Sequence, residues 1–199
     1  MVTPLHIRIA GTHSTGKTTL ARRIEMELRA TGLTVTRTGG LAKRAAALGF
    51  PKMTRHTIAS TEWIIAAGAA AVREAELTAE VVIIDRTAHD AIAYLQAANQ
   101  HRHETILTND LARLMALADL HSHRPAGYLA TVLDPAMPLA APIGKDPDWT
   151  ETGFRTAVDE YLHQLLAERN IDHLAVPSDS HATAVRAAVE AVHDAMATA

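Results

Sequence analysis

The chain of 199 residues is 48% hydrophobic and 21% charged, with a formal net charge of −3 and no cysteine. This balance is typical of a globular domain with a sizeable core, alone or with a small lid, and the lack of cysteine excludes disulfides and thiolate metal sites. Because there is no long basic run, and because the most apolar helical stretch, residues 63–72, is too short to span a bilayer, we expect no nucleic-acid partner and no membrane association. The N-terminus enters a strand without an apolar signal segment, so we expect a cytoplasmic protein.

The first elements are a strand over residues 5–10, the sequence GTHSTGKT over residues 11–18, and a helix over residues 19–30. The pattern G-x-x-x-x-G-K-[ST] between a strand and a helix is typical of a phosphate-binding loop, in which backbone N–H groups and a helix N-terminus converge on one anion. We expect Lys17 to reach the β- and γ-phosphates and the Thr18 hydroxyl to ligate Mg²⁺. The predicted cofactors are therefore ATP and Mg²⁺, with GTP left open as the donor. The predicted nucleotide site comprises Gly11, Thr12, His13, Ser14, Thr15, Gly16, Lys17, Thr18 and Thr19.

The next elements predict the acceptor side of this site. A β-branched strand over residues 33–38 is followed by a short helix over residues 41–48 and a long helix over residues 57–80. In a parallel sheet the loops that follow the strands gather at one edge, where ligands bind. We therefore expect the acceptor to contact side chains from this region: Arg37, Arg44, Glu62 and Trp63. Solvent-exposed charges, and a core position for Trp63, are the alternatives.

Residues 81–85, VVIID, form the clearest strand, with Arg86 directly after it and a helix from Thr87 to Asn99. An acid at the end of such a strand can hold Mg²⁺ or its waters, or take the proton of the acceptor, and Arg86 can clamp a phosphoryl group or an anionic acceptor. The alternatives are a helix-dipole role for Asp85 and a structural ion pair for Arg86. We expect the catalytic residues to be Lys17, Asp85 and Arg86, and the metal ligands to be Thr18 and Asp85.

A second helix is predicted over residues 109–121, and the remaining elements are a strand, a helix, a strand and a helix, over residues 128–133, 154–165, 172–176 and from Ser180 onward. The proline- and glycine-rich stretch 136–150 is too long for a plain connection, so we expect a lid insertion over about residues 136–152. Lys145 and Arg155 flank it, and either they close over the phosphates or they are surface charges. Strands that alternate with helices predict an α/β fold, a parallel sheet with helices on both faces.

The GTHSTGKTTL run resembles the loop of small P-loop kinases, a group that includes NadR-type ribosylnicotinamide kinase domains and deoxynucleoside and nucleotide kinases. The resemblance extends to Asp85-Arg86-Thr87 with Ala91–Tyr94, to residues 133–138 and to residues 61–64. It implies a P-loop NTPase fold over residues 1–199, with a five-stranded parallel sheet in the order 2-3-1-4-5. No acid follows the second strand, where many nucleoside kinases carry one, so the resemblance moves the role of base onto Asp85.

Two hypotheses for function follow. The first is an ATP-dependent kinase that transfers the γ-phosphoryl group to a small metabolite, such as a nucleoside or nucleotide, mainly by positioning and charge neutralisation. The second is an ATP-binding regulatory or switch protein with weak ATPase activity. The partner in the first is a small-molecule acceptor, and the sequence leaves a homodimer open.

Overall fold

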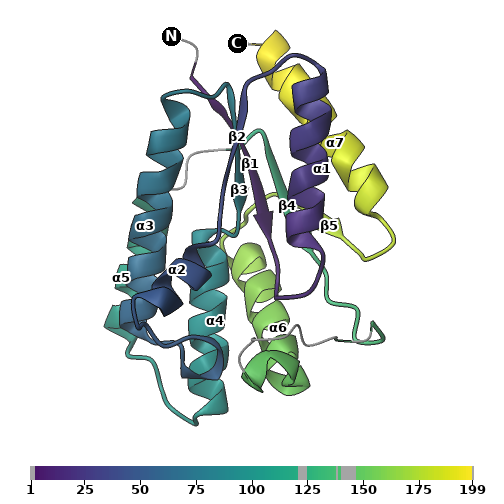
Figure 1. The fold of residues 1–199 in the computed structure, drawn as a ribbon. Helices are drawn as coiled ribbons and strands as arrows, with labels where there is room; N and C mark the ends of the chain where they lie inside the picture. The colour runs from purple at the N-terminus through teal and green to yellow at the C-terminus, as the bar shows by residue number, and fades with distance from the viewer. Residues whose placement is uncertain (1–2, 121–124, 138, 140–146, 199) are drawn as a thin grey trace.

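The computed structural model describes residues 3–120, 125–137, 139 and 147–198. Its centre is a parallel sheet of five strands in the order β2-β3-β1-β4-β5 (Figure 1), which confirms the expected fold class and strand order. Every neighbouring pair of strands in this sheet is parallel. The strands are β1 (Leu5–Ala10), β2 (Val35–Thr38), β3 (Val81–Asp85), β4 (Gly127–Thr131) and β5 (Leu174–Val176).

Helices cover both faces of the sheet (Figure 1). The α-helices are α1 (Lys17–Ala30), α2 (Leu41–Ala47), α3 (Ile58–Glu76), α4 (Ala88–His101), α5 (Thr108–Leu120), α6 (Thr152–Glu168) and α7 (His181–Ala197), and the short 3-10 helices are η1 (Met53–Arg55) and η2 (Pro147–Thr150). Helices α1 and α7 share one buried cluster with one face of the sheet, while α4 and α6 pack on the other face. Helix α3 packs beside α4, and α2 and α5 pack against α3.

The central strands are buried on both sides, as expected for a parallel sheet. Ile7 and Ile9 of β1 and Ile83 of β3 belong to the cluster under α1 and α7, and Val82 points to the opposite side, toward α3. The β-branched run of β3 suits this pleated and fully packed position. Within the described ranges, no helix has the length and apolar character needed to cross a membrane.

The boundaries of several elements differ by a few residues from the sequence-based expectation, and in two of them, β2 and α3, the contacts explain the difference. Strand β2 begins at Val35 rather than at residue 33, because the backbone N–H and the hydroxyl of Thr34 both donate to the carboxylate of Glu80, each at 2.8 Å. Helix α3 ends at Glu76 rather than at residue 80, and the chain turns there to reach this contact. Polar side chains therefore form a turn where β-branched and helix-forming residues predicted longer elements.

Candidate functional site

Two positions in the loop between β1 and α1 can be occupied only by glycine. Gly16, at the N-cap of α1, has φ 81° and Gly11 has φ 146°. A Cβ on Gly11 would collide with the Thr131 hydroxyl, and a Cβ on Gly16 would collide with the ring of His181. The backbone therefore comes close to its neighbours, and Ser14, Gly16, Thr18 and Thr19 remain exposed. This is the geometry of an anion cradle at a helix N-terminus.

Two residues that were not predicted from the sequence to contact the loop, Asp90 and Thr131, form hydrogen bonds with it. One oxygen of the buried Asp90 carboxylate accepts from the Gly11 N–H at 2.9 Å, and the other accepts from the Thr87 N–H at 2.7 Å. The hydroxyl of Thr131, at the end of β4, lies 2.6 Å from the hydroxyl of Thr15. In the sequence, Thr87-x-x-Asp90 signals only a helix N-terminus, as a capping box does. The fold turns that capping carboxylate into a support for the phosphate-binding loop.

Lys17 lies buried inside the loop. Its Nζ donates to the Thr12 carbonyl and lies 3.3 Å from the Thr15 hydroxyl. Burial and, to a smaller extent, the positive charge of Arg86 together lower the pKa of Lys17 to about 7, against the opposing effects of Asp90 and Asp85. An anion beside this ammonium would favour the charged form and offset the cost of burial. The electrostatics therefore suit a bound phosphate.

Thr18 and Asp85 meet at the mouth of the loop. The Thr18 hydroxyl donates to Oδ2 of the Asp85 carboxylate at 2.8 Å, and this carboxylate is only 7% exposed. Nη1 of Arg37 lies 3.9 Å from the same oxygen, while Nε of Arg37 donates to Glu25 at 3.0 Å. A hydroxyl and a carboxylate held together are the oxygen ligands that Mg²⁺ takes beside a nucleotide, so the residues fit that ion. Arg37 lies at this junction and does not line the large cavity described below.

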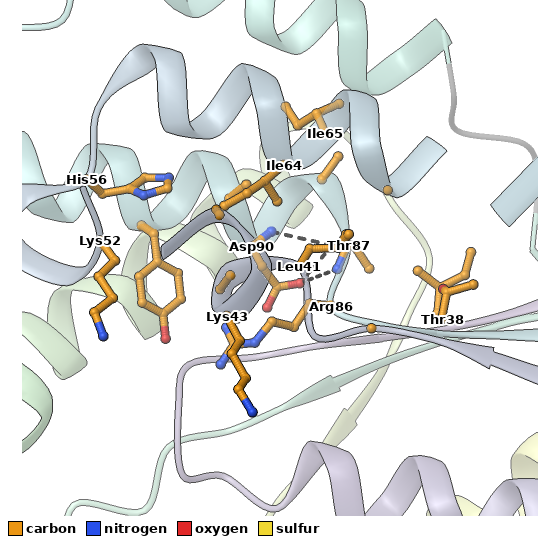
Figure 2. Close-up of a pocket in the computed structure, with 18 of the residues that line it drawn as sticks. Thr38, Leu41, Lys43, Lys52, His56, Ile64, Ile65, Arg86, Thr87 and Asp90 are labelled. Atoms are coloured by element: carbon orange, nitrogen blue, oxygen red, sulfur yellow. Dashed lines mark hydrogen bonds between the residues drawn. The ribbon is translucent and has the colours of Figure 1, made fainter. Parts of the chain in front are cut away.

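Arg86 connects the loop to the acceptor side. It has φ 84°, an uncommon value for a residue with a side chain, and its backbone N–H donates to the Ile9 carbonyl at 3.0 Å. Its guanidinium carbon lies 5.3 Å from the centroid of the Tyr94 ring. The strained backbone turns the side chain into a cavity next to the loop, where Figure 2 shows it near Asp90.

The side chain of His13 points into the protein, where it joins the loop to η2. The Trp149 carbonyl accepts from Nε2 of His13 at 3.0 Å, and because a carbonyl only accepts, this nitrogen carries the proton. Nδ1 then accepts from the Tyr94 hydroxyl, also at 3.0 Å. Burial lowers the pKa of His13 to about 3, so the ring is neutral at physiological pH.

Arg155 makes a second connection between the loop and α6. It is 5% exposed, with Nε donating to the His13 carbonyl at 3.1 Å and Nη2 donating to the Ser14 carbonyl at 3.2 Å. It therefore contacts the loop through the backbone and is not a surface charge. Lys145, and residues 138 and 140–146 of the expected lid, lie outside the described residues.

A cavity of about 440 Å³ opens beside the loop, within the size range of small-molecule sites. It lies between the ends of β2 and β3 and helices α2, α3 and α4, with Trp149 of η2 also in its lining. Most of its wall is aliphatic, including Leu41, Ile64, Ile65 and Val72. Figure 2 shows Ile64 and Ile65 on the side formed by α3, with Arg86, Lys43 and Lys52 extending from other segments of the wall.

Besides Arg37, three residues that we expected to contact the acceptor lie outside this cavity. The guanidinium carbon of Arg44 lies 5.6 Å from the centroid of the Trp63 ring, and both line a separate hollow on α3. Glu62 accepts from Nη1 of Arg113 on α5 at 2.8 Å. Of the expected acceptor-side residues, the structure brings only Arg86 into the large cavity.

A family model described as an AAA domain matches residues 6–184. No curated protein matches the chain significantly. Among solved structures, the NadR protein in complex with NR is similar, with a TM-score of 0.68 at 18% identity, covering 96% of this chain and 51% of that one. Thymidylate kinase from Ehrlichia chaffeensis has a TM-score of 0.62 at 16% identity, covering 93% of this chain and 98% of that one. This chain thus spans about half of the NadR chain, and at these identities the likeness shows a shared fold.

Proposed function

The chain belongs to this family of AAA domains, and we propose that it is an ATP-dependent phosphotransferase that acts on a small acceptor of the nucleoside or nucleotide kind. The donor would lie on residues 11–19, and the acceptor in the cavity lined by Arg86. NadR has been solved with NAD and AMP-PNP, at 18% identity to this chain and a TM-score of 0.66, and this supports the choice of a nucleotide donor.

One observation carries the proposal. Arg86 follows directly on Asp85, whose carboxylate accepts from Thr18 of the phosphate-binding loop, and its own side chain lines the large cavity. A donor site and an acceptor-sized cavity therefore meet at two consecutive residues. A protein that only bound or hydrolysed a nucleotide would need no second cavity at this position.

The residues divide the work of in-line transfer. Lys17 would neutralise charge on the β- and γ-phosphates, and the loop N–H groups would orient them. Mg²⁺, held by Thr18 and Asp85 when bound, would supply charge neutralisation between the β- and γ-phosphates. The guanidinium of Arg86 would stabilise charge that develops between donor and acceptor, because its planar fork matches phosphoryl oxygens. Tyr94 holds this guanidinium from one side.

A second candidate function is a nucleotide-gated switch protein. The bonds of His13 to Trp149 and of Arg155 to the loop carbonyls favour it, because they connect the phosphate-binding loop directly to η2 and α6. A change in the loop on nucleotide binding would reach these elements. In this case ATP would be hydrolysed slowly and no acceptor would increase the rate.

The two functions are separated by measuring ADP release from ATP with and without a panel of nucleosides and nucleotides. The kinase proposal predicts release that depends on one class of acceptor and is lost in Lys17→Ala, with the circular dichroism spectrum unchanged. Slow release that no acceptor stimulates, together with a protein partner retained only in the presence of ATP, would favour the switch.

A further inference from the structure

The cavity beside the loop has an unusual balance of charge. Among the described residues that line it, five are basic and Asp90 is the only carboxylate. Both oxygens of Asp90 already accept hydrogen bonds, from Gly11 and from Thr87. The basic side chains are Arg8, Lys43, Lys52, Arg73 and Arg86. Arg73 forms an ion pair with Glu76 at 2.8 Å, so we consider Arg86 and Lys43 as the cations that would contact a ligand.

Three neutral polar side chains of the lining, those of Tyr94, Thr87 and His56, are already hydrogen-bonded. The Tyr94 hydroxyl bonds to the backbone N–H and to Nδ1 of His13, each at 3.0 Å. The Thr87 hydroxyl donates to Asp90 at 2.9 Å, and Nε2 of His56 lies 3.0 Å from the Thr61 hydroxyl. A nucleoside needs several neutral donors and acceptors to match its base and sugar, and unmatched buried groups are costly. The cavity thus favours a ligand with few such groups.

Arg86 and Lys43 are directed to the same region. Figure 2 shows the side chains of Arg86 and Lys43 extending in the same direction, and both line the cavity. Arg86 is close enough to Lys17 to lower the pKa of that lysine. A positive potential therefore spans the junction between the donor site and the cavity, and an anionic ligand would offset it.

The rest of the wall is mainly aliphatic, with the rings of His56, Tyr94 and Trp149 also in the lining. Leu41 comes from α2, Ile64, Ile65 and Val72 come from α3, and the lining between them is largely alanine and glycine. Such a wall stabilises a ligand in proportion to the apolar area that it removes from water.

We propose that the acceptor is an acid with an apolar body, whose phosphate or carboxylate lies against Arg86 and Lys43 while its apolar part lies against Leu41, Ile64 and Val72. This rests on the proposed phosphotransferase function, with an acid that has an apolar body as the acceptor in place of a nucleoside or nucleotide. An ionised oxygen of the acceptor forms the new bond to the γ-phosphorus. The bond from that phosphorus to the β–γ bridging oxygen breaks, and its electron pair leaves with ADP.

This route also accounts for the position of Asp85. Its carboxylate accepts from Thr18 and is not part of the cavity lining, so it is not placed to remove a proton from an acceptor hydroxyl. An acceptor oxygen that is already ionised has no proton to lose, so no general base is needed. The expected product is a mixed anhydride of the acceptor and phosphoric acid.

Binding is tested by calorimetry with octyl phosphate, octanoate, octan-1-ol and methyl phosphate, and with thymidine and adenosine for comparison. At least one of the two octyl anions should bind tenfold or more tightly than octan-1-ol, and which of them does so identifies the acid. If octyl phosphate binds, it should also bind at least tenfold more tightly than methyl phosphate. Equal binding of anion and alcohol would overturn the proposal, as would equal binding of the octyl and methyl phosphates or tighter binding of thymidine or adenosine than of either octyl anion.

Variants identify the cations. Arg86→Met and Lys43→Met should each remove most of the preference for the anion, while Arg22→Met, on the exposed side of α1, should leave it unchanged. Lys43 is exposed, so its variant remains informative if Arg86→Met does not fold. An unchanged preference in Lys43→Met and in a folded Arg86→Met would contradict the assignment.

Turnover separates this inference from the function on which it rests. If an octyl anion binds but no acceptor-dependent release of ADP is seen, the anion-binding cavity is supported and the phosphotransferase function is contradicted. ADP release that depends on neutral nucleosides, with no binding of either octyl anion, would keep the function and overturn the acid acceptor.

Discussion

The Thr18 hydroxyl and the Asp85 carboxylate lie 2.8 Å apart, and this bond joins the first turn of α1 to the end of β3. The two residues are separated by 67 positions in the sequence, and the pairing of β1 with β3 brings them together. In the proposed function, these two residues would hold the magnesium ion that accompanies the bound triphosphate.

Replacing Asp85 with asparagine tests this pair. The variant keeps the size of the side chain but removes its charge, so we expect the fold to persist and turnover to fall by about 100-fold or more. ATP binding should weaken mainly where it depends on Mg²⁺, and calorimetry with and without the metal measures this. Near-normal turnover in the folded variant would mean that the carboxylate has only a structural role.

Arg86→Lys keeps the positive charge but loses the planar fork. We expect kcat/KM for the acceptor to fall by at least tenfold, with a much smaller change in the Kd for ATP. The same substitution at the exposed Arg22 is the control. An equal loss in both quantities would show that Arg86 serves the donor site rather than the acceptor.

Three buried histidines predict a loss of stability in mild acid. Burial lowers the pKa of His13 to about 3 and the pKa of His56 and of His89 to about 4. Below the unfolded-state pKa of about 6.5, these histidines bind protons in the unfolded chain but remain neutral in the native state. The free energy of unfolding should therefore decrease as the pH is lowered from about 6.5 to about 4. The decrease should be up to about 1.4 kcal/mol per pH unit for each histidine.

Urea unfolding at several pH values measures this slope. His89→Gln should flatten it, because one of the three protons no longer contributes, whereas His193→Gln, at an exposed position of α7, should leave it unchanged. A stability that is constant from pH 6.5 to pH 4.5 would contradict the assignment of neutral buried rings.

Trp149 reports on the connection between the phosphate-binding loop and η2. Its ring centroid lies 4.7 Å from that of His13, whose imidazole also donates to its backbone carbonyl. In a Trp63→Phe background, which leaves Trp149 as the single tryptophan, a non-hydrolysable ATP analogue should change the emission. Arg155→Met should reduce that change, since it removes the second connection. Identical spectra with and without the analogue would argue against coupling of the two elements.

The same analogue tests the expected lid. If the insertion over about residues 136–152 closes on the donor, limited proteolysis there should slow when the analogue is present. Cleavage at equal rates with and without the analogue would contradict the prediction that this segment closes as a lid.

The sequence predicted the parts of the site that depend on local pattern. The strand–loop–helix context identified residues 11–18, and the β-branched run ending in Asp85 located the second half of the pair. Four supports of the loop were missed, because each acts across 79 to 136 positions of the chain: Asp90, Tyr94, Thr131 and Trp149. No spacing rule connects residues so far apart before the strand order is known.

Helix α3 shows a second feature that could not be predicted from the sequence. It is apolar on several sides, so its periodicity did not indicate which face meets the acceptor. Ile64, Ile65 and Val72 face the cavity, whereas Trp63 turns to Arg44 and Phe50. An aromatic residue was therefore expected where aliphatic ones lie.

In the proposed function, one chain brings a nucleotide donor and a small acceptor together at Asp85 and Arg86. The most direct test of that function is the initial rate of ADP release from ATP by the wild-type protein and by Lys17→Ala, across neutral nucleosides, nucleotides and the octyl acids. The account predicts a rate that rises at least tenfold with an acidic acceptor in the wild-type protein and no such rise in Lys17→Ala. A rate that no acceptor increases, in a wild-type protein that binds ATP, would contradict it.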